Sequence, residues 1–196
     1  MRDFKNIYSL DASDDYAEPA PECDQIPFNS SAIARGELPW PSAMRLILGE
    51  GSGSAVDMMG TSWAAPTLIS ARVVESLLRA NITGWHSTPV TFAETHMQHE
   101  FHALSVVGRC ASIDDSASPI VTRMPHSPRG IPKPYRVGIY FAVDSWDGSD
   151  VFTPGESTWI FVVQKVKQLL EDMKATNVCF RPLTEIQRMV LPNGTS

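Results

Sequence analysis

The sequence predicts an α+β protein with a mixed, largely antiparallel sheet and two short amphipathic helices. Residues 135–183 follow the order strand, turn, strand, helix, strand, and a weaker copy of the strand–helix–strand part lies earlier in the chain. The chain has 196 residues, 43% of them hydrophobic and 19% charged, which is enough to build one domain with a full core. We therefore expect a single domain over residues 1–196, with pseudo-repeated units at about 66–90 and 158–183.

The second of these units contains the stronger helix signal. After an apolar stretch at 159–163, apolar residues recur at helical spacing while charged residues fill the other face. The apolar set is Val163, Val166, Leu169, Leu170 and Met173. We place Leu169 at the centre of the buried stripe, expect Asn177 to end the helix, and expect a strand over 178–183.

The first unit repeats this pattern with a recognisable helix start. Ser70 is well placed as an N-cap, and Gly84 is the residue expected just past the helix end. The matches are Val74 with Val166 and Leu77-Leu78 with Leu169-Leu170 at a separation of 92, and, after a one-residue slip, Thr83 with Thr176 and Pro89 with Pro182. Two amphipathic helices can share a leucine pair by chance. The Thr and Pro matches lie outside the helical pattern, so we interpret the likeness as internal repetition.

The remaining chain predicts short strands separated by loops. Phe4–Leu10 is a candidate first strand, residues 27–42 predict irregular structure with one helical turn, and residues 44–48 predict a short strand. Residues 90–108 predict one long strand or a bent pair. Residues 111–134 contain many prolines and predict a long loop lying on the sheet.

Charge and cysteine content exclude several classes of protein. A net charge of -6 argues against a nucleic-acid partner, and no segment approaches the roughly 18 apolar residues of a membrane span. The N-terminus lacks the apolar core of a signal peptide. Cys23, Cys110 and Cys179 are far apart with no CxxC motif, which favours reduced thiols. We therefore expect a cytoplasmic protein with no membrane partner.

The acidic segment 144–150 is the strongest candidate for a binding site. Asp144, Asp147 and Asp150 are three apart, which is not the alternate-position pattern of a calcium-binding EF-hand loop. One interpretation is a hairpin connection in which Asp147-Gly148 makes the turn and Trp146 packs over the sheet edge. The other is an exposed acidic and aromatic patch for a protein partner, because Trp is a frequent anchor residue at interfaces.

Three histidines between the two units support an alternative. On a strand, His96 and His102 share one face while His99 points away, so a metal site would need ligands from elsewhere. We expect no metal and no cofactor. The alternative is a small-ligand-binding domain or hydrolase in which these histidines meet the 144–150 carboxylates in a cleft, although no recognisable catalytic signature occurs.

The order of short motifs resembles the immunity proteins of bacterial polymorphic-toxin systems, with immunity protein family eleven and its relatives as the nearest group. The resemblance covers roughly residues 40–186. Its motifs are Asp57-Met58-Met59, Ser70, Thr83-Gly84-Trp85, Val107-Gly108-Arg109-Cys110, Trp146-Asp147-Gly148-Ser149-Asp150 and the terminal Phe161-Val162-Val163, Leu169-Leu170, Asn177-Val178 and Pro182-Leu183. That family commonly has Ser or Thr before the second helix, where this chain has Val163-Gln164.

The resemblance implies a non-catalytic protein that binds and neutralises one cognate toxin. The acidic balance suits a toxin that is basic, because opposite charge speeds association. We expect the toxin to contact Asp144, Trp146, Asp147 and Asp150, together with Asp114 and Asp115. The 111–134 segment, which ends in the basic residues Arg123, Arg129 and Lys133, is the second region that qualifies. The sequence leaves the oligomeric state open.

Overall fold

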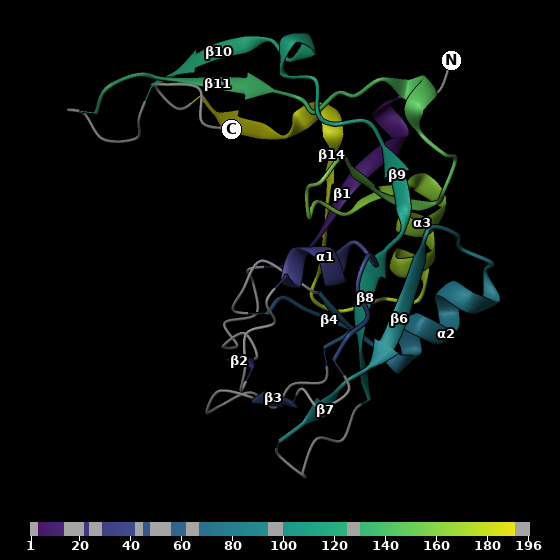
Figure 1. Cartoon of the computed structure of the whole chain (residues 1–196). Coiled ribbons are helices and arrows are strands. Elements are labelled where there is room, and N and C mark those ends of the chain that lie inside the picture. The colour runs from purple at the N-terminus through teal and green to yellow at the C-terminus, as the bar shows by residue number, and fades with distance from the viewer. Residues whose placement is uncertain are drawn as a thin grey trace.

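The computed structural model describes residues 4–13, 22–23, 29–41, 45–47, 56–61, 67–93, 100–124 and 130–190. It confirms the α+β class with mostly antiparallel sheets. Two sheets with one helix each form the body, and a third sheet projects from its upper end as an arm (Figure 1). A fourth, small sheet lies at the lower end of the body.

The first body sheet has the strand order β4-β5-β8-β6. Its strands are β4 (Met58–Met59), β5 (Leu68–Ser70), β8 (Phe101–Val106) and β6 (Trp85–Pro89). Helix α2 (Ala71–Arg79) joins β5 to β6. Both strands pair antiparallel with β8, so they run parallel to one another with β8 between them.

The second body sheet repeats this topology in the order β12-β13-β1-β14 and adds β9 beside β12. Its strands are β12 (Val151–Pro154), β13 (Phe161–Val163), β1 (Ile7–Ala12), β14 (Val178–Pro182) and β9 (Gly108–Cys110). Helix α3 (Gln164–Asp172) joins β13 to β14, and β1 lies between them.

The repeat has a uniform separation of 93, which corrects the expected 92 with a slip. Both the helices, Ala71–Arg79 and Gln164–Asp172, and the flanking strands begin 93 positions apart. Buried Leu77 therefore corresponds to buried Leu170, while Leu78 is 64% exposed. Leu169 is only half-buried, so it lies at the edge of the stripe and Leu170 lies at its centre.

The two halves of the chain exchange one strand each. Strand β8 precedes the second repeat in the chain but completes the sheet of the first, and β1 precedes the first repeat but completes the sheet of the second. The registers agree: His102 pairs with Ile69, and Tyr8 pairs with Val162 at the corresponding position. Neither half can therefore form its sheet without a strand from the other.

The helix ends are also equivalent, and they come earlier than expected. Asn81 (φ 49°) and Lys174 (φ 53°) adopt left-handed conformations directly after the helices, ahead of the predicted Gly84 and Asn177. Those two residues occupy a second left-handed position, with φ 86° and 57°. Gly84 is required there, because an added Cβ would collide with the carbonyl oxygen of Val151.

Of the two repeat helices, only α2 has the side-chain N-cap that the sequence predicts. Ser70 Oγ accepts a hydrogen bond from the Val73 backbone N–H at 3.3 Å. Val163 occupies the corresponding position before α3 and offers no side-chain acceptor. Helix α3 therefore begins without a side-chain cap.

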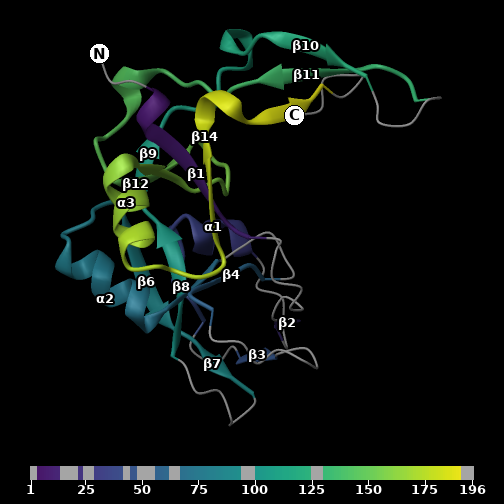
Figure 2. The same ribbon diagram turned by 180° about the vertical axis from the view of Figure 1, so that it is seen from behind.

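Three apolar clusters hold the elements together. The central cluster combines both halves, and helices α2 and α3 pack together against it on one side of the body (Figure 2). It includes Leu10, Leu77, Leu104, Val166 and Leu170. The lower cluster includes Trp40, Leu46 and Phe101, and the upper one includes Phe141, Phe152 and Phe161.

The smaller elements agree in part with the sequence. A 3-10 helix at Phe4–Asn6 precedes β1, and the single helical turn expected in 27–42 is α1 (Ser30–Ala34). The expected short strand is β3 (Arg45–Ile47), which pairs with β2 (Glu22–Cys23) and β7 (Thr91–Phe92). The segment 90–108 is thus neither one strand nor a simple bent pair, because β7 and β8 belong to different sheets.

The 111–134 segment is not a long loop, which corrects the prediction. It contains a 3-10 helix (Asp115–Ala117), β10 (Ile120–Arg123) and the start of β11 (Lys133–Val137). These strands pair antiparallel, and β15 (Gln187–Met189), which follows a 3-10 helix at Leu183–Glu185, pairs with β11. We call β10, β11 and β15 the arm. Its prolines concealed the strand pattern, because Pro134 lies within β11.

Candidate functional site

The acidic segment is an irregular connection between β11 and β12, and the hairpin interpretation is wrong. Beyond Val137 the chain forms no strand until β12, apart from a 3-10 helix at Val143–Ser145. Within the described residues, β12 pairs only with β13 and β9. Gly148 does turn the chain, with φ 88°, and Trp146 stacks on Phe152 at a centroid distance of 4.7 Å.

Asp150 ties the end of this segment to the first repeat. Its Oδ2 accepts hydrogen bonds from the Thr83 backbone N–H at 3.0 Å and from Thr83 Oγ1 at 3.2 Å. The Asp150 N–H donates to Thr83 Oγ1 at 3.1 Å, and Lys165 Nζ lies 3.5 Å from the carboxylate. The carboxylate is thus a link between the halves and is only 19% exposed.

Asp57 makes the equivalent link in the other direction and is more deeply buried. Its carboxylate accepts hydrogen bonds from the Thr176 N–H at 2.8 Å, from Ser70 Oγ at 2.8 Å and from the Arg72 guanidinium. Burial alone would raise the pKa of Asp57, but the bonds from Arg72, Thr176 and Ser70 outweigh it and lower the pKa below its usual value. The pairs Asp57–Thr176 and Asp150–Thr83 share the separation of 93.

Asp147 also holds the backbone around it. Its Oδ2 accepts from the Arg109 N–H at 2.8 Å and its Oδ1 from the Ser149 N–H at 2.9 Å. Partial burial opposes ionisation, but these two backbone bonds lower the pKa of the carboxyl. Trp146 Nε1 donates to the Ser149 carbonyl oxygen at 3.1 Å, so the indole is fixed as well.

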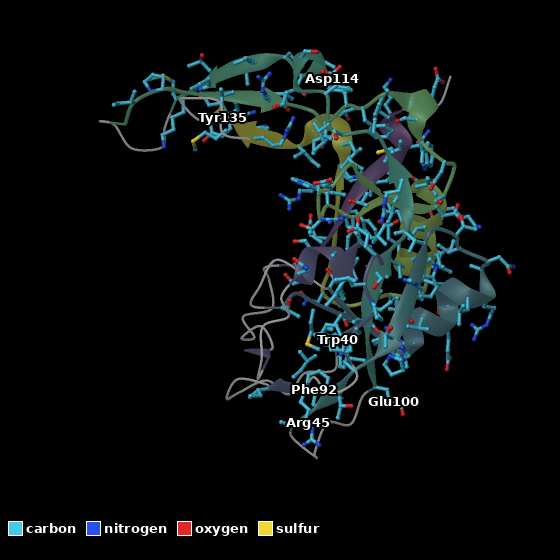
Figure 3. All side chains as sticks on the ribbon, in the orientation of Figure 1. Trp40, Arg45, Phe92, Glu100, Asp114 and Tyr135 are labelled. Carbon is cyan, nitrogen blue, oxygen red and sulfur yellow. The ribbon has the colours of Figure 1, made fainter. Side chains whose placement is uncertain are left out.

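Asp114 and Asp115 lie at the root of the arm. Asp114 caps the following 3-10 helix by accepting from the Ser116 N–H at 2.9 Å, and bonds from Ser116 lower the pKa of its carboxyl. The Asp115 carboxylate lies 2.7 Å from Arg188 Nη2 and 3.5 Å from Arg136 Nε. Figure 3 labels Asp114 at this end of the molecule, far from the lower cluster around Trp40.

The structure brings the two predicted acidic groups into neighbouring segments. The Ala111 N–H donates to Ser145 Oγ at 2.8 Å, and the Asp114 N–H donates to the Tyr140 carbonyl oxygen at 2.8 Å. Asp144 is exposed and pairs with no described residue. The other predicted residues each have a structural contact, which the local sequence did not reveal. The sequence did contain a signal for the two Asp–Thr links. Asp57 and Asp150 are 93 positions apart, and so are Thr83 and Thr176.

Of the three histidines of the alternative site, the structure describes only His102, and it places that residue away from the acidic segment. His96 and His99 lie outside the described residues, and His102 is on β8 opposite Pro89. Asp150 contacts Thr83, which precedes the other end of β6. The length of β6 alone therefore separates His102 from Asp150 by at least about 13 Å along the strand. Among the described residues, no three His, Cys, Asp or Glu side chains gather closely enough to hold a metal ion.

The arm holds the candidate residues that the acidic interpretation missed. All four residues of β10 are exposed, so both faces of that strand meet solvent. In the arm, Ile120 is 57% exposed and Met189 42%, and beside its strands Met124 is 76% and Ile131 78% exposed. Arg123 pairs with Lys133, and Arg136 pairs with Arg188, across the ladder. The basic residues near the end of the 111–134 segment were the sequence signal for this second candidate surface.

No protein-family model matches this chain, and no curated protein matches it significantly. Within the described residues, no helix has both the length and the apolar character needed to cross a bilayer.

Proposed function

We propose that this chain is an immunity protein that binds a cognate toxin and neutralises it by occlusion. The observation that carries the proposal is the arm, a three-stranded sheet that stands away from the body (Figure 1). A sheet is normally covered on at least one face, because that face must bury its apolar side chains. In the arm, large apolar side chains face solvent instead. Exposed apolar groups gathered in one place are typical of protein interaction sites.

The chemistry of the body supports binding over catalysis. A catalytic carboxylate must be free to touch a substrate or a proton. Asp57, Asp147 and Asp150 instead use their oxygens on backbone N–H groups and nearby side chains. The motifs that carry the resemblance to immunity proteins include these residues, so the motifs describe a scaffold on which variable surfaces can differ.

The proposal is tested with the C-terminal domain of a large secreted protein that we expect to be encoded immediately upstream. We expect the two purified proteins to form a complex of fixed stoichiometry in size-exclusion chromatography, and the toxin's activity to fall in proportion to the complex. A toxin domain from an unrelated system serves as the specificity control. Absence of a complex with the neighbouring domain would rule out the proposed function.

A further inference from the structure

Resting on that proposed function, we infer that one face of the arm docks an acidic surface of the toxin. The face carries a row of Val121, Tyr135 and Met189, with Arg123 and Lys133 next to it toward the tip. We call these five residues the docking face. The inference reverses the charge first expected of the toxin, and it moves the contact from the acidic segment to the arm.

The pairing register defines the docking face. Val121 pairs with Tyr135, and Tyr135 pairs with Met189, so these side chains project from the same face in one row across the three strands. Arg123 and Lys133 pair two residues further along and therefore project from that face too. Tyr135 lies out on the arm, away from the body (Figure 3). Tyr, Met and Arg are enriched in the centres of protein interfaces.

The charges of the arm indicate what it binds. Arg123 opposite Lys133 and Arg136 opposite Arg188 are like-charge cross-strand pairs, which destabilise a sheet. Asp115 balances the pair at the root, on the other face. No described residue balances Arg123 and Lys133, and the sequence has no Asp or Glu between residues 116 and 143. Within the described residues, the arm thus carries a positive charge without an acidic partner beside an apolar row.

An acidic protein patch fits this surface better than an extended polyanion does. The whole chain has a net charge of -6, so nucleic acid or an anionic membrane would be repelled by the body as it approached the arm. A toxin with a local carboxylate cluster would meet only the tip of the arm. Its apolar neighbours would pack against Tyr135 and Met189, as in the core of a protein interface.

The test compares two variants with the same change in net charge. In R123Q/K133Q the tip of the docking face is neutralised, while R79E changes the net charge by the same amount at exposed Arg79 on α2. We expect R123Q/K133Q to slow association with the neighbouring toxin domain about tenfold at low salt and to weaken the salt dependence of the rate. R79E should associate at nearly the wild-type rate. Thermal unfolding should show R123Q/K133Q at least as stable as wild type, because a repulsive pair is removed.

Each other outcome points elsewhere. If the wild type binds the toxin domain and R123Q/K133Q binds as fast, the proposed function stands and the docking face is wrong. If the wild type does not bind that domain, the function itself falls and this inference with it. Wild-type dimers that dissociate in R123Q/K133Q, seen by sedimentation, would assign the face to a second copy. Binding to phosphatidylserine vesicles that is lost in R123Q/K133Q would assign it to a membrane surface.

Discussion

Replacing Asp57 with Asn tests the link between the two halves. The Asp57 side chain is 7% exposed, and Thr176, Ser70 and Arg72 all donate hydrogen bonds to its carboxylate. The Asn amide carries no charge, and its NH₂ group would face these hydrogen-bond donors without being able to accept from them. Breaking a buried ion pair costs about 3–5 kcal/mol, and the 54% exposure of Arg72 lets water recover part of it, so we expect about 3 kcal/mol.

The repeat supplies a matched control for this change. Asp150 makes the equivalent link through Thr83, but its side chain is 19% exposed and its cation, Lys165, lies 3.5 Å away. Asp150→Asn should therefore cost only about 1–1.5 kcal/mol. Urea unfolding of the two variants at pH 7 measures the difference. Equal costs, or a larger cost for Asp150→Asn, would refute the claim that burial makes the Asp57 link the stronger one.

The pH dependence gives a second measurement on the same variants. Because the folded protein holds the pKa of Asp57 below its unfolded value of about 3.9, the charged form contributes stability above that value. This contribution is lost as pH falls through the lower, folded pKa. Asp57→Asn should therefore lose less stability than wild type on acidification below about pH 4. Parallel stability curves over this range would contradict the assignment.

Three further changes test the packing, the helix cap and the thiols. Leu170→Ala should cost about 2–5 kcal/mol in urea unfolding, because Leu170 is 3% exposed, and Leu169→Ala should cost clearly less; the reverse order would restore the register expected from sequence. Val163→Thr supplies the missing cap and should stabilise by about 0.5–1 kcal/mol, whereas an unchanged unfolding midpoint would show that the hydroxyl does not reach the helix. Burial raises the pKa of Cys110 to about 12, so its thiol should react with a disulfide reagent only on unfolding, while half-buried Cys179 reacts first. Rapid reaction of Cys110 in the native protein would show that the upper cluster is open there.

Local features of the structure could be predicted because they depend on nearby residues. The helical spacing of Val166 and Leu170 and the cap at Ser70 are visible within a few positions. The exact separation of the two repeats was harder to predict. Leu77 can be aligned with Leu169, at a separation of 92, or with Leu170, at a separation of 93. Only the burial of Leu77 and Leu170 distinguishes the two alignments, and that burial depends on residues from both halves of the chain.

Features that depend on distant partners could not be predicted. Strand β1 lies in the second sheet and β8 in the first, so each pairs with residues far away in the chain. The residue pattern of a strand does not indicate which distant strand it pairs with. Strand β12 is four residues long and follows an acidic segment, so it has no clear period. The contact of Asp150 could not be predicted because Thr83, which donates hydrogen bonds to its carboxylate, lies in the other half of the chain.

Protection of living cells tests the central claim most directly. Cells that express the neighbouring toxin domain together with wild-type protein or R79E should survive. Cells with R123Q/K133Q, at matched protein level and unchanged thermal stability, should lose viability by at least tenfold when the toxin is expressed strongly enough that association limits rescue. Failure of the wild type to protect would contradict the immunity function. Full protection by R123Q/K133Q under those conditions would contradict the role of the arm.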